Sequence, residues 1–372
     1  MWNIWKQEIY KTASRKILWL GLLLLLLIVH LRLYEERSRY SVTIDGQSYS
    51  GQEAIEKDQA LTAAYAGILT EEKVQQIYQE FGFYYYDPQQ DQMVGNYCSQ
   101  YITREMTNFN QTDSGQLESI QFLEGDAWEQ KAAPLLQGSV RFDYAYGWSD
   151  LRETFSFLMS IVLFVLFIIG ISPVFSDEYM LKTADILLTT KRGAKSGIWL
   201  KMAAALVLSA VIYTVFSALL WLMYQSVFGT QGLDASAVLI GVPLQGYGLD
   251  SILHFFLFAF FLGLAGLLLL TSMTLAVSAI CRNAFLTVII SIVLFLLPYA
   301  WMQALSVLLT PFLSTRLLKA LSHFMVSMPF FLPINWGFSF TAGQVQMHLG
   351  IAAVMTVCCA ALGYWKYRNY QG

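Results

Sequence analysis

The side chains best suited to polar chemistry gather in one stretch, from Ser172 to Lys201, which lies between two long apolar runs. Its acids are Asp177, Glu178 and Asp185, and its bases are Lys182, Lys191, Arg192, Lys195 and Lys201. A basic excess in a short loop between membrane spans marks the cytoplasmic side of the membrane. These side chains offer ionic pairing, either with lipid phosphates or with the charged groups of a partner.

A short amphipathic helix is predicted within this stretch, from Met180 to Thr189, because apolar residues recur there at helical spacing. One face carries Met180, Leu181, Ala184, Leu187 and Leu188, and the other carries Lys182, Asp185 and Thr189. Such a helix would lie against the inner membrane surface, and the basic turn Lys191-Arg192-Gly193 would follow it. An ordinary positively charged connector has the same appearance, so these residues alone leave both interpretations open.

The sequence lacks the usual patterns of an enzyme or a nucleotide-binding protein. Gly193-Ala194-Lys195-Ser196 is a superficial echo of a Walker A loop, since it has neither the adjacent Gly-Lys pair nor a preceding strand. The His and Cys residues have no metal-ligand spacing, apart from Cys358-Cys359 inside an apolar run. The basic residues are scattered beside apolar runs, which argues against nucleic-acid binding. We therefore expect no catalytic residue, no metal and no cofactor on this chain.

The composition, with 56% hydrophobic residues, predicts an integral membrane protein. We expect a membrane all-α fold with six transmembrane helices, at residues 17–33, 154–175, 202–229, 251–280, 284–309 and 347–365. Residues 1–16 fit either an elbow helix on the cytoplasmic leaflet or a plain basic tail. Residues 310–346 fit short external helices or a re-entrant segment. Basic residues mark both termini, the 176–201 loop and Arg282, so both termini are predicted to lie inside.

Residues 34–150 are predicted to form an extracytoplasmic domain, α-rich with some β structure, between the first two spans. The domain is acidic, with 7 Lys and Arg against 19 Asp and Glu. Residues 40–49 fit a β-hairpin around Asp45-Gly46, and helices are expected at 52–65, 70–81, 93–108 and 126–136. Cys98 is the lone cysteine of this domain, so no disulfide framework is expected.

The predicted spans carry almost no charge. No Asp, Glu, Lys or Arg occurs between Thr154 and Ser176, Met202 and Leu233, Ser251 and Cys281, or Ala284 and Thr315. Carriers that are driven by protons or sodium need ionisable or ion-liganding groups at membrane depth. The energy for transport would therefore come from elsewhere, and a partner ATPase would supply it.

The 176–201 loop resembles the first cytoplasmic loop of ABC-2-type permeases, the membrane subunits of type V-like ABC exporters. In that family a Glu follows the second span, a Leu-Leu-(Ser/Thr)-Thr run precedes a basic residue, and a Lys begins the third span. The matching residues here are Glu178, Leu187, Leu188, Thr189, Thr190, Arg192 and Lys201. Many members carry a Gly soon after the Glu, where this chain has Thr183-Ala184. The sequence from Asp45 to Phe81 also resembles the external insert of some Gram-positive permeases.

The resemblance implies that the loop presses on a cytoplasmic ABC ATPase, which binds ATP–Mg, and that Glu178, Leu187, Leu188, Arg192 and Lys195 form the coupling surface. The chain would be the permease subunit of an exporter in a bacterial cell membrane, paired with an identical or sister permease. The apolar, aromatic spans favour an amphipathic, lipid-like or peptide cargo. The alternative is a sensor or resistance module whose external domain binds an antimicrobial peptide or lipid.

Overall fold

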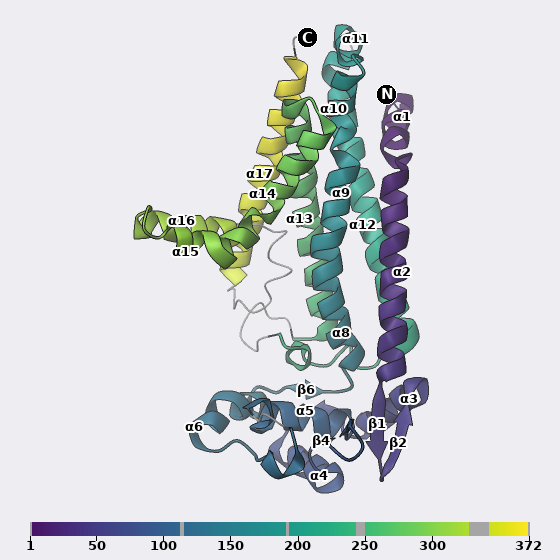
Figure 1. Ribbon diagram of the computed structural model, residues 1–372, viewed down its shortest axis with the longest axis vertical. Coiled ribbons are helices and arrows are strands. Elements are labelled where there is room, and N and C mark those ends of the chain that lie inside the picture. The colour runs from purple at the N-terminus through teal and green to yellow at the C-terminus, as the bar shows by residue number, and fades with distance from the viewer. Residues whose placement is uncertain (1, 112–114, 191–192, 243–249, 327–341, 371–372) are drawn as a thin grey trace. The chain divides into compact units, whose positions relative to one another are not determined.

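A computed structural model of the chain describes residues 2–111, 115–190, 193–242, 250–326 and 342–370 (Figure 1). Most of these residues are helical, and the chain divides into two compact units. Unit 1 comprises Met1–Leu27, Glu153–Leu220 and Leu257–Gly372, and unit 2 comprises Ile28–Arg152 and Trp221–Phe256.

Five helices among the described residues are long and apolar enough to cross a membrane: Lys16–Arg39, Tyr146–Met180, Lys195–Phe228, Ile252–Cys281 and Val345–Arg368. A sixth span requires Ala284–Ala300 and Gln303–Leu309 to count as one element, although they are bent by 56°. The predicted all-α membrane fold is confirmed, whereas the predicted count of six depends on that bent pair. The second apolar helix is 35 residues long, so it extends beyond the predicted 154–175 at both ends.

The helices of unit 1 position the polar loop. The chain begins with α1 (Trp2–Ala13) and the first part of α2 (Lys16–Arg39), and later returns through the π-helical η4 (Phe155–Val162) and α9 (Leu163–Ile171). The short helices α10 (Pro173–Met180) and α11 (Ala184–Thr189) and the π-helical η5 (Gly193–Gly197) then lead into α12 (Ile198–Phe228). The unit also contains α13 (Ile252–Cys281), α14 (Ala284–Ala300) and α17 (Ala342–Arg368).

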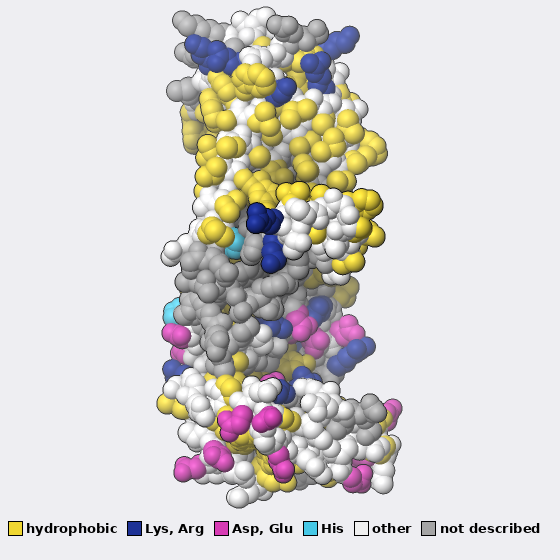
Figure 2. All heavy atoms as spheres, turned by 90° about the vertical axis from the view of Figure 1, so that its left-hand side faces the viewer, with side chains coloured by type: hydrophobic (Ala, Val, Ile, Leu, Met, Phe, Trp, Pro, Cys, Tyr) yellow, Lys and Arg dark blue, Asp and Glu magenta, His cyan; other side chains and the backbone are white. Residues whose placement is uncertain are grey.

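The spans pack closely at two glycines. Gly21 of α2 leaves room for the side chain of Leu166, and Gly363 of α17 lies against the backbone of Ala276 in α13. A larger residue at either position would push these helices apart, which is the usual role of glycine between membrane helices. Figure 2 shows a band of hydrophobic side chains over the helices of unit 1, with Lys and Arg side chains gathered at one end of them.

Helix α14 is interrupted near its end. Pro298 lies inside it, and the π-helical η7 (Trp301–Leu305) and α15 (Ser306–Leu309) follow. Proline removes a helical hydrogen bond, and a π-segment often accompanies a kink, so together they account for the bend. Helix α16 (Thr315–Val326) runs across the direction of α14 (Figure 1), and the rest of the predicted 310–346 segment lies mostly outside the described residues.

The domain in unit 2 begins with the predicted hairpin. Strands β1 (Ser41–Ile44) and β2 (Gln47–Ser50) pair antiparallel, with Val42 opposite Tyr49. Asp45 and Gly46 both have positive φ angles, of 51° and 75°, as a two-residue hairpin turn requires. Two further pairs complete the β structure: β3 (Gly67–Ile68) with β6 (Arg141–Phe142), and β4 (Tyr85–Asp87) with β5 (Gln92–Val94).

Helices supply most of the domain's core. They are α3 (Gly51–Ala64), α4 (Glu71–Phe81), α5 (Tyr97–Met106), α6 (Gly125–Ala127), the π-helical η3 (Trp128–Ala132) and α7 (Ala133–Gln137), with short 3-10 turns at Phe109–Gln111 and Leu117–Ser119. A further 3-10 turn, Ala237–Ile240, belongs to the second segment of unit 2. The predicted helix start at Thr70 is confirmed, because the Thr70 side chain accepts a hydrogen bond from the Lys73 N–H. Helix α8 (Tyr146–Thr154) leads out of the domain.

Asp58 is a buried carboxyl in this core. It accepts hydrogen bonds from the Tyr40 hydroxyl at 2.5 Å and from the Tyr97 N–H at 3.1 Å. Burial raises the pKa of Asp58 to about 6, although both hydrogen bonds oppose that rise. Cys98 lies nearby with its thiol directed at Thr62, and burial raises its pKa to about 12, so it is an unreactive thiol.

Candidate functional site at the loop between the second and third spans

The loop begins at a break in the second span. Pro173 has no N–H to donate, and the helix restarts there as α10. The Ser278 hydroxyl of α13 fills the break: it accepts from the N–H groups of Phe175 and Ser176, at 3.2 and 3.0 Å, and donates to the Ser172 carbonyl at 2.5 Å. One side chain from another helix therefore satisfies three backbone groups and fixes the base of α10.

Glu178 lies on α10 and forms the centre of an ionic cluster. Its carboxylate is paired with the Lys201 ammonium of α12, and it accepts a hydrogen bond from the Tyr367 hydroxyl of α17. Glu178 is 8% exposed and Lys201 is 6% exposed, so both charges are buried. Such charges persist in a protein interior when they are paired and hydrogen-bonded, as they are here.

The N-terminal helix α1 contributes the rest of this cluster. Lys11 lies 3.1 Å from Glu8 and 3.9 Å from Glu178, and Glu8 lies 4.0 Å from Lys201. Two carboxylates therefore alternate with two ammonium groups, and their charges cancel. We call Glu8, Lys11, Glu178, Lys201 and Tyr367 the Glu178 junction.

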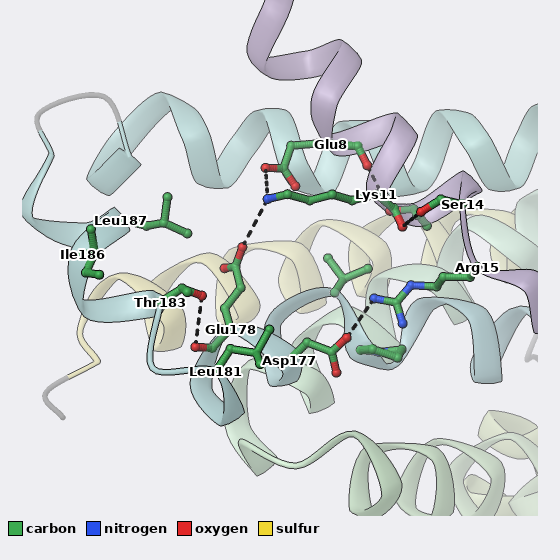
Figure 3. A pocket seen from close by; sticks show the side chains of 13 residues that line it. Glu8, Lys11, Ser14, Arg15, Asp177, Glu178, Leu181, Thr183, Ile186 and Leu187 are labelled. Carbon is green, nitrogen blue, oxygen red and sulfur yellow. Dashed lines mark hydrogen bonds and ion pairs between the residues drawn. The ribbon is translucent and has the colours of Figure 1, made fainter.

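A cavity of about 700 Å³ opens beside the junction. Figure 3 shows Lys11 and Arg15 on one of its sides and Asp177 and Glu178 on the other, with Arg15 paired to Asp177 at 3.2 Å. Its remaining lining is largely apolar and includes Ile186 of α11. The cavity therefore separates the N-terminal helices from α10 and α11, and ion pairs bridge it along one edge.

The predicted continuous helix from Met180 to Thr189 is wrong, because α10 ends at Met180 and α11 begins at Ala184. The Lys182 N–H bonds to the Tyr179 carbonyl, the Thr183 N–H bonds to the Glu178 carbonyl, and Lys182 has a φ of 55°. This is a Schellman motif, a common helix stop whose left-handed position usually holds glycine. The stop could not be seen in the sequence because a lysine occupies that position.

The turn also changes which apolar side chains face outward. Ala184 is buried, and Leu187 and Leu188 are half-buried, as an inward face requires. Met180, Leu181 and Ile186 are exposed, at 59%, 72% and 68%. Met180 and Leu181 therefore do not share the inner face that the spacing predicted, because the turn redirects them. We call Met180, Leu181 and Ile186 the exposed apolar tip.

The residues predicted for coupling occupy different environments. Glu178 is buried in the junction, Leu188 packs against the cluster that contains Tyr179 and Tyr367, and Lys195 is exposed. Arg192 lies outside the described residues. Among the residues that the structure describes, no group of three or more His, Cys, Asp or Glu side chains is placed to hold a metal ion.

Sequence reasoning did not identify Lys11, Ser278 or Tyr367 as parts of this site. Tyr367 is separated from Glu178 by 189 residues and Ser278 from Phe175 by 103, so no local pattern connects them. The one available signal was the position of Lys201 at the start of an otherwise uncharged span.

These features define a polytopic α-helical membrane protein whose polar loop is built into the ends of its spans. The family model described as ABC-2 family transporter protein matches residues 2–370, and the chain belongs to that family. It is therefore a membrane permease subunit of an ABC transporter, which implies association with an ABC ATPase. No curated protein and no solved structure matches the chain.

Proposed function

We propose that the chain is the permease of an ATP-driven exporter and that α11, with the exposed apolar tip, rests on a separate cytoplasmic ATPase. The exposed apolar tip is the observation that supports this proposal. Met180, Leu181 and Ile186 expose apolar surface beside the exposed charges of Lys182 and Asp185. Apolar groups presented within a polar surface are typical of an interface with another protein.

The charge distribution supports a cytoplasmic position for this tip. Lys16, Lys195, Arg282 and Lys366 lie at the loop-side ends of their helices, and basic residues favour the inside of the membrane. In this topology both termini lie inside, and the acidic 34–150 domain lies outside the bacterial cell membrane. Arg192 and Lys195 would pair with acidic groups of the ATPase or with lipid phosphates.

The transport cycle follows from this arrangement. ATP–Mg would bind to the partner ATPase, and closure of the ATPase would tilt α11. Two permeases, identical or sister chains, would then switch a path between them from inward to outward access. The described spans are apolar and rich in aromatic side chains, which favours an amphipathic, lipid-like or peptide cargo over a sugar or an ion.

The test uses the full-length, affinity-tagged chain and the ATPase that co-purifies with it. Ile186→Asp places a charge in the tip and is expected to reduce ATPase retention about tenfold or more, the effect of losing an anchor at an interface core. Ile68→Asp is the matched control, because Ile68 is also exposed, at 58%, but lies in the domain. Full retention by the Ile186 variant would contradict the proposed docking.

A second variant tests the basic turn. The double reversal Arg192→Glu and Lys195→Glu is expected to weaken ATPase association most strongly at low salt, because exposed charge pairs are screened as salt rises. A chain from which no ATPase co-purifies under any of these conditions would favour the sensor or resistance module instead.

A further inference from the structure

Glu178 uses its polar groups within its own chain. One carboxylate oxygen is paired with Lys201, the other accepts from Tyr367, and the backbone carbonyl accepts from the Thr183 N–H. The side chain is almost completely covered. A cation of a partner protein would have to displace Lys201 in order to reach this carboxylate. The position of Glu178 is therefore suited to holding helices together, in contrast to the exposed tip.

The elements that meet at Glu178 are distant in sequence. Lys201 belongs to the first turn of α12, Tyr367 to the last turns of α17, and Lys11 to α1. Ser278 of α13 secures the other end of α10. Helix α10 is thus attached near its N-terminal end to α13, and through Glu178 to α12 and α17. Helix α11 follows after a three-residue turn.

Aromatic contacts strengthen the connection to α17. The Tyr367 ring lies 4.6 Å from that of Phe175 and 5.5 Å from that of Tyr179, between centroids. The Tyr370 ring lies 4.5 Å from that of Tyr179, and the Arg282 guanidinium lies over Tyr370 at 4.6 Å. Tyr367 and Tyr370, at the end of α17 and just after it, therefore contact α10, and Tyr370 also contacts the turn between α13 and α14.

We propose that Glu178 is a positioning residue that makes α10, the start of α12 and the end of α17 move as one body, so that displacement of α11 is transmitted to the last span. This inference rests on the proposed function, because it needs an ATPase that displaces α11. It assigns Lys201 and Tyr367 to the same task, and it separates two roles within the loop: the exposed apolar tip binds the ATPase, and the Glu178 junction transmits its motion.

The experiment compares variants of the junction with a variant of the tip. Tyr367→Phe removes one hydroxyl and keeps the ring that contacts Phe175 and Tyr179, and Glu178→Gln removes the charge and keeps the shape. Tyr10→Phe is the matched control, because Tyr10 is 73% exposed on α1. For each full-length chain three quantities are measured: thermal unfolding in detergent, retention of the co-purifying ATPase, and the ratio of Mg-ATP hydrolysis with and without the permease.

Both junction variants are expected to retain the ATPase at the wild-type level while the hydrolysis ratio falls about tenfold, the factor that a hydrogen bond to a charged group is worth. Tyr10→Phe should match the wild type in all three measurements. The exchange Glu178→Lys with Lys201→Glu restores an ion pair and should recover part of the ratio that Glu178→Gln loses.

Two outcomes would overturn the inference. In the first, Tyr367→Phe and Glu178→Gln leave the hydrolysis ratio unchanged although Ile186→Asp abolishes retention, so the proposed function survives without the junction's role. In the second, retention and ratio fall together in proportion to the melting temperature, which is the signature of a purely structural pair. If Ile186→Asp also leaves both retention and ratio unchanged, the proposed function itself fails.

Discussion

Glu178 and Asp58 are both buried carboxyl groups that accept a hydrogen bond from a tyrosine hydroxyl, yet their surroundings differ in one respect. Glu178 is paired with Lys201, whereas no Lys or Arg among the described residues pairs with Asp58. The Asp58 carboxyl receives only neutral donors, so burial raises its pKa to about 6. A buried carboxyl without a cationic partner therefore loses its proton at a higher pH than an ordinary carboxyl does.

Asp150 lies between these two cases. Its carboxylate accepts from the Arg32 guanidinium and from the Tyr224 hydroxyl, both at 2.5 Å, so it has a cation and a tyrosine as Glu178 does. The Arg32 side chain is 40% exposed, whereas that of Lys201 is 7% exposed. We therefore expect the three carboxyl groups to differ in their effect on the free energy of unfolding, and substitutions can test this order.

The largest effect is expected at the junction. Glu178→Ala removes the nearest partner of the buried Lys201 ammonium and leaves only Glu8, at 4.0 Å, among the described residues, which costs about 3–5 kcal/mol of unfolding free energy. The measurement is equilibrium unfolding of the full-length chain in mixed micelles. Replacing both residues by methionine removes both charges and should recover most of the loss. A cost below that of Asp150→Ala would reverse the order proposed here.

At Asp58 we expect stability to depend on pH, because its carboxyl has no cationic partner among the described residues. Its pKa is raised in the folded state, so the associated stability is fully present below the ordinary pKa of 3.8 and is lost as pH rises through about 6. The amplitude is about 3 kcal/mol. Measured against Asp58→Asn, the wild-type chain should lose stability between about pH 4 and about pH 6, the range that separates the two pKa values. A difference that stays constant over this range would show that Asp58 does not titrate there.

A smaller loss is expected at Asp150. Asp150→Ala removes the acceptor of Tyr224 and the partner of Arg32, but the guanidinium can turn toward solvent, so the cost is about 1–3 kcal/mol. The same unfolding titration measures it. Tyr224→Phe removes one hydrogen bond and should cost about 1 kcal/mol. A larger loss from Tyr224→Phe than from Asp150→Ala would mean that the aspartate is not the centre of this group.

The smallest effect is expected from an exposed pair. Glu35 and Arg39 lie 2.8 Å apart in α2, with side chains 56% and 78% exposed. Exposed pairs at this helical spacing contribute about 0.3–0.5 kcal/mol, and salt screens them. Glu35→Ala is therefore the baseline for the other variants. If its cost equalled that of Glu178→Ala, burial would not be the quantity that separates these sites.

Local features of the sequence were sufficient for most of the fold. The apolar runs predicted the spans, Asp45-Gly46 predicted the hairpin turn, and Thr70 predicted the start of α4, because each signal lies within a few residues of the structure it specifies. Strands β3 and β6 were missed because each has two residues and exists only through pairing with the other. Strands β4 and β5 were also missed, because the helix predicted from Met93 begins only at Tyr97.

The candidate site was predictable in position but not in its connections. The loop was recognisable from its charges between two apolar runs. The stop at Lys182 was not, because a non-glycine residue occupies the left-handed position. The contact of Glu178 with Tyr367 was not recognisable in the sequence, because only tertiary packing brings together residues so far apart in the chain. Helical periodicity describes a face of one helix and says nothing about what will cover it.

The long separation between Glu178 and Tyr367 also bears on how the protein is made. The tyrosine lies 189 residues after the glutamate, a distance that a ribosome covers in about 10 to 40 s. During that interval the carboxylate exists without its hydroxyl donor. The Glu178 junction is therefore complete only when the final span has been synthesised, and a chain that ends before Tyr367 would lack the hydroxyl donor of Glu178.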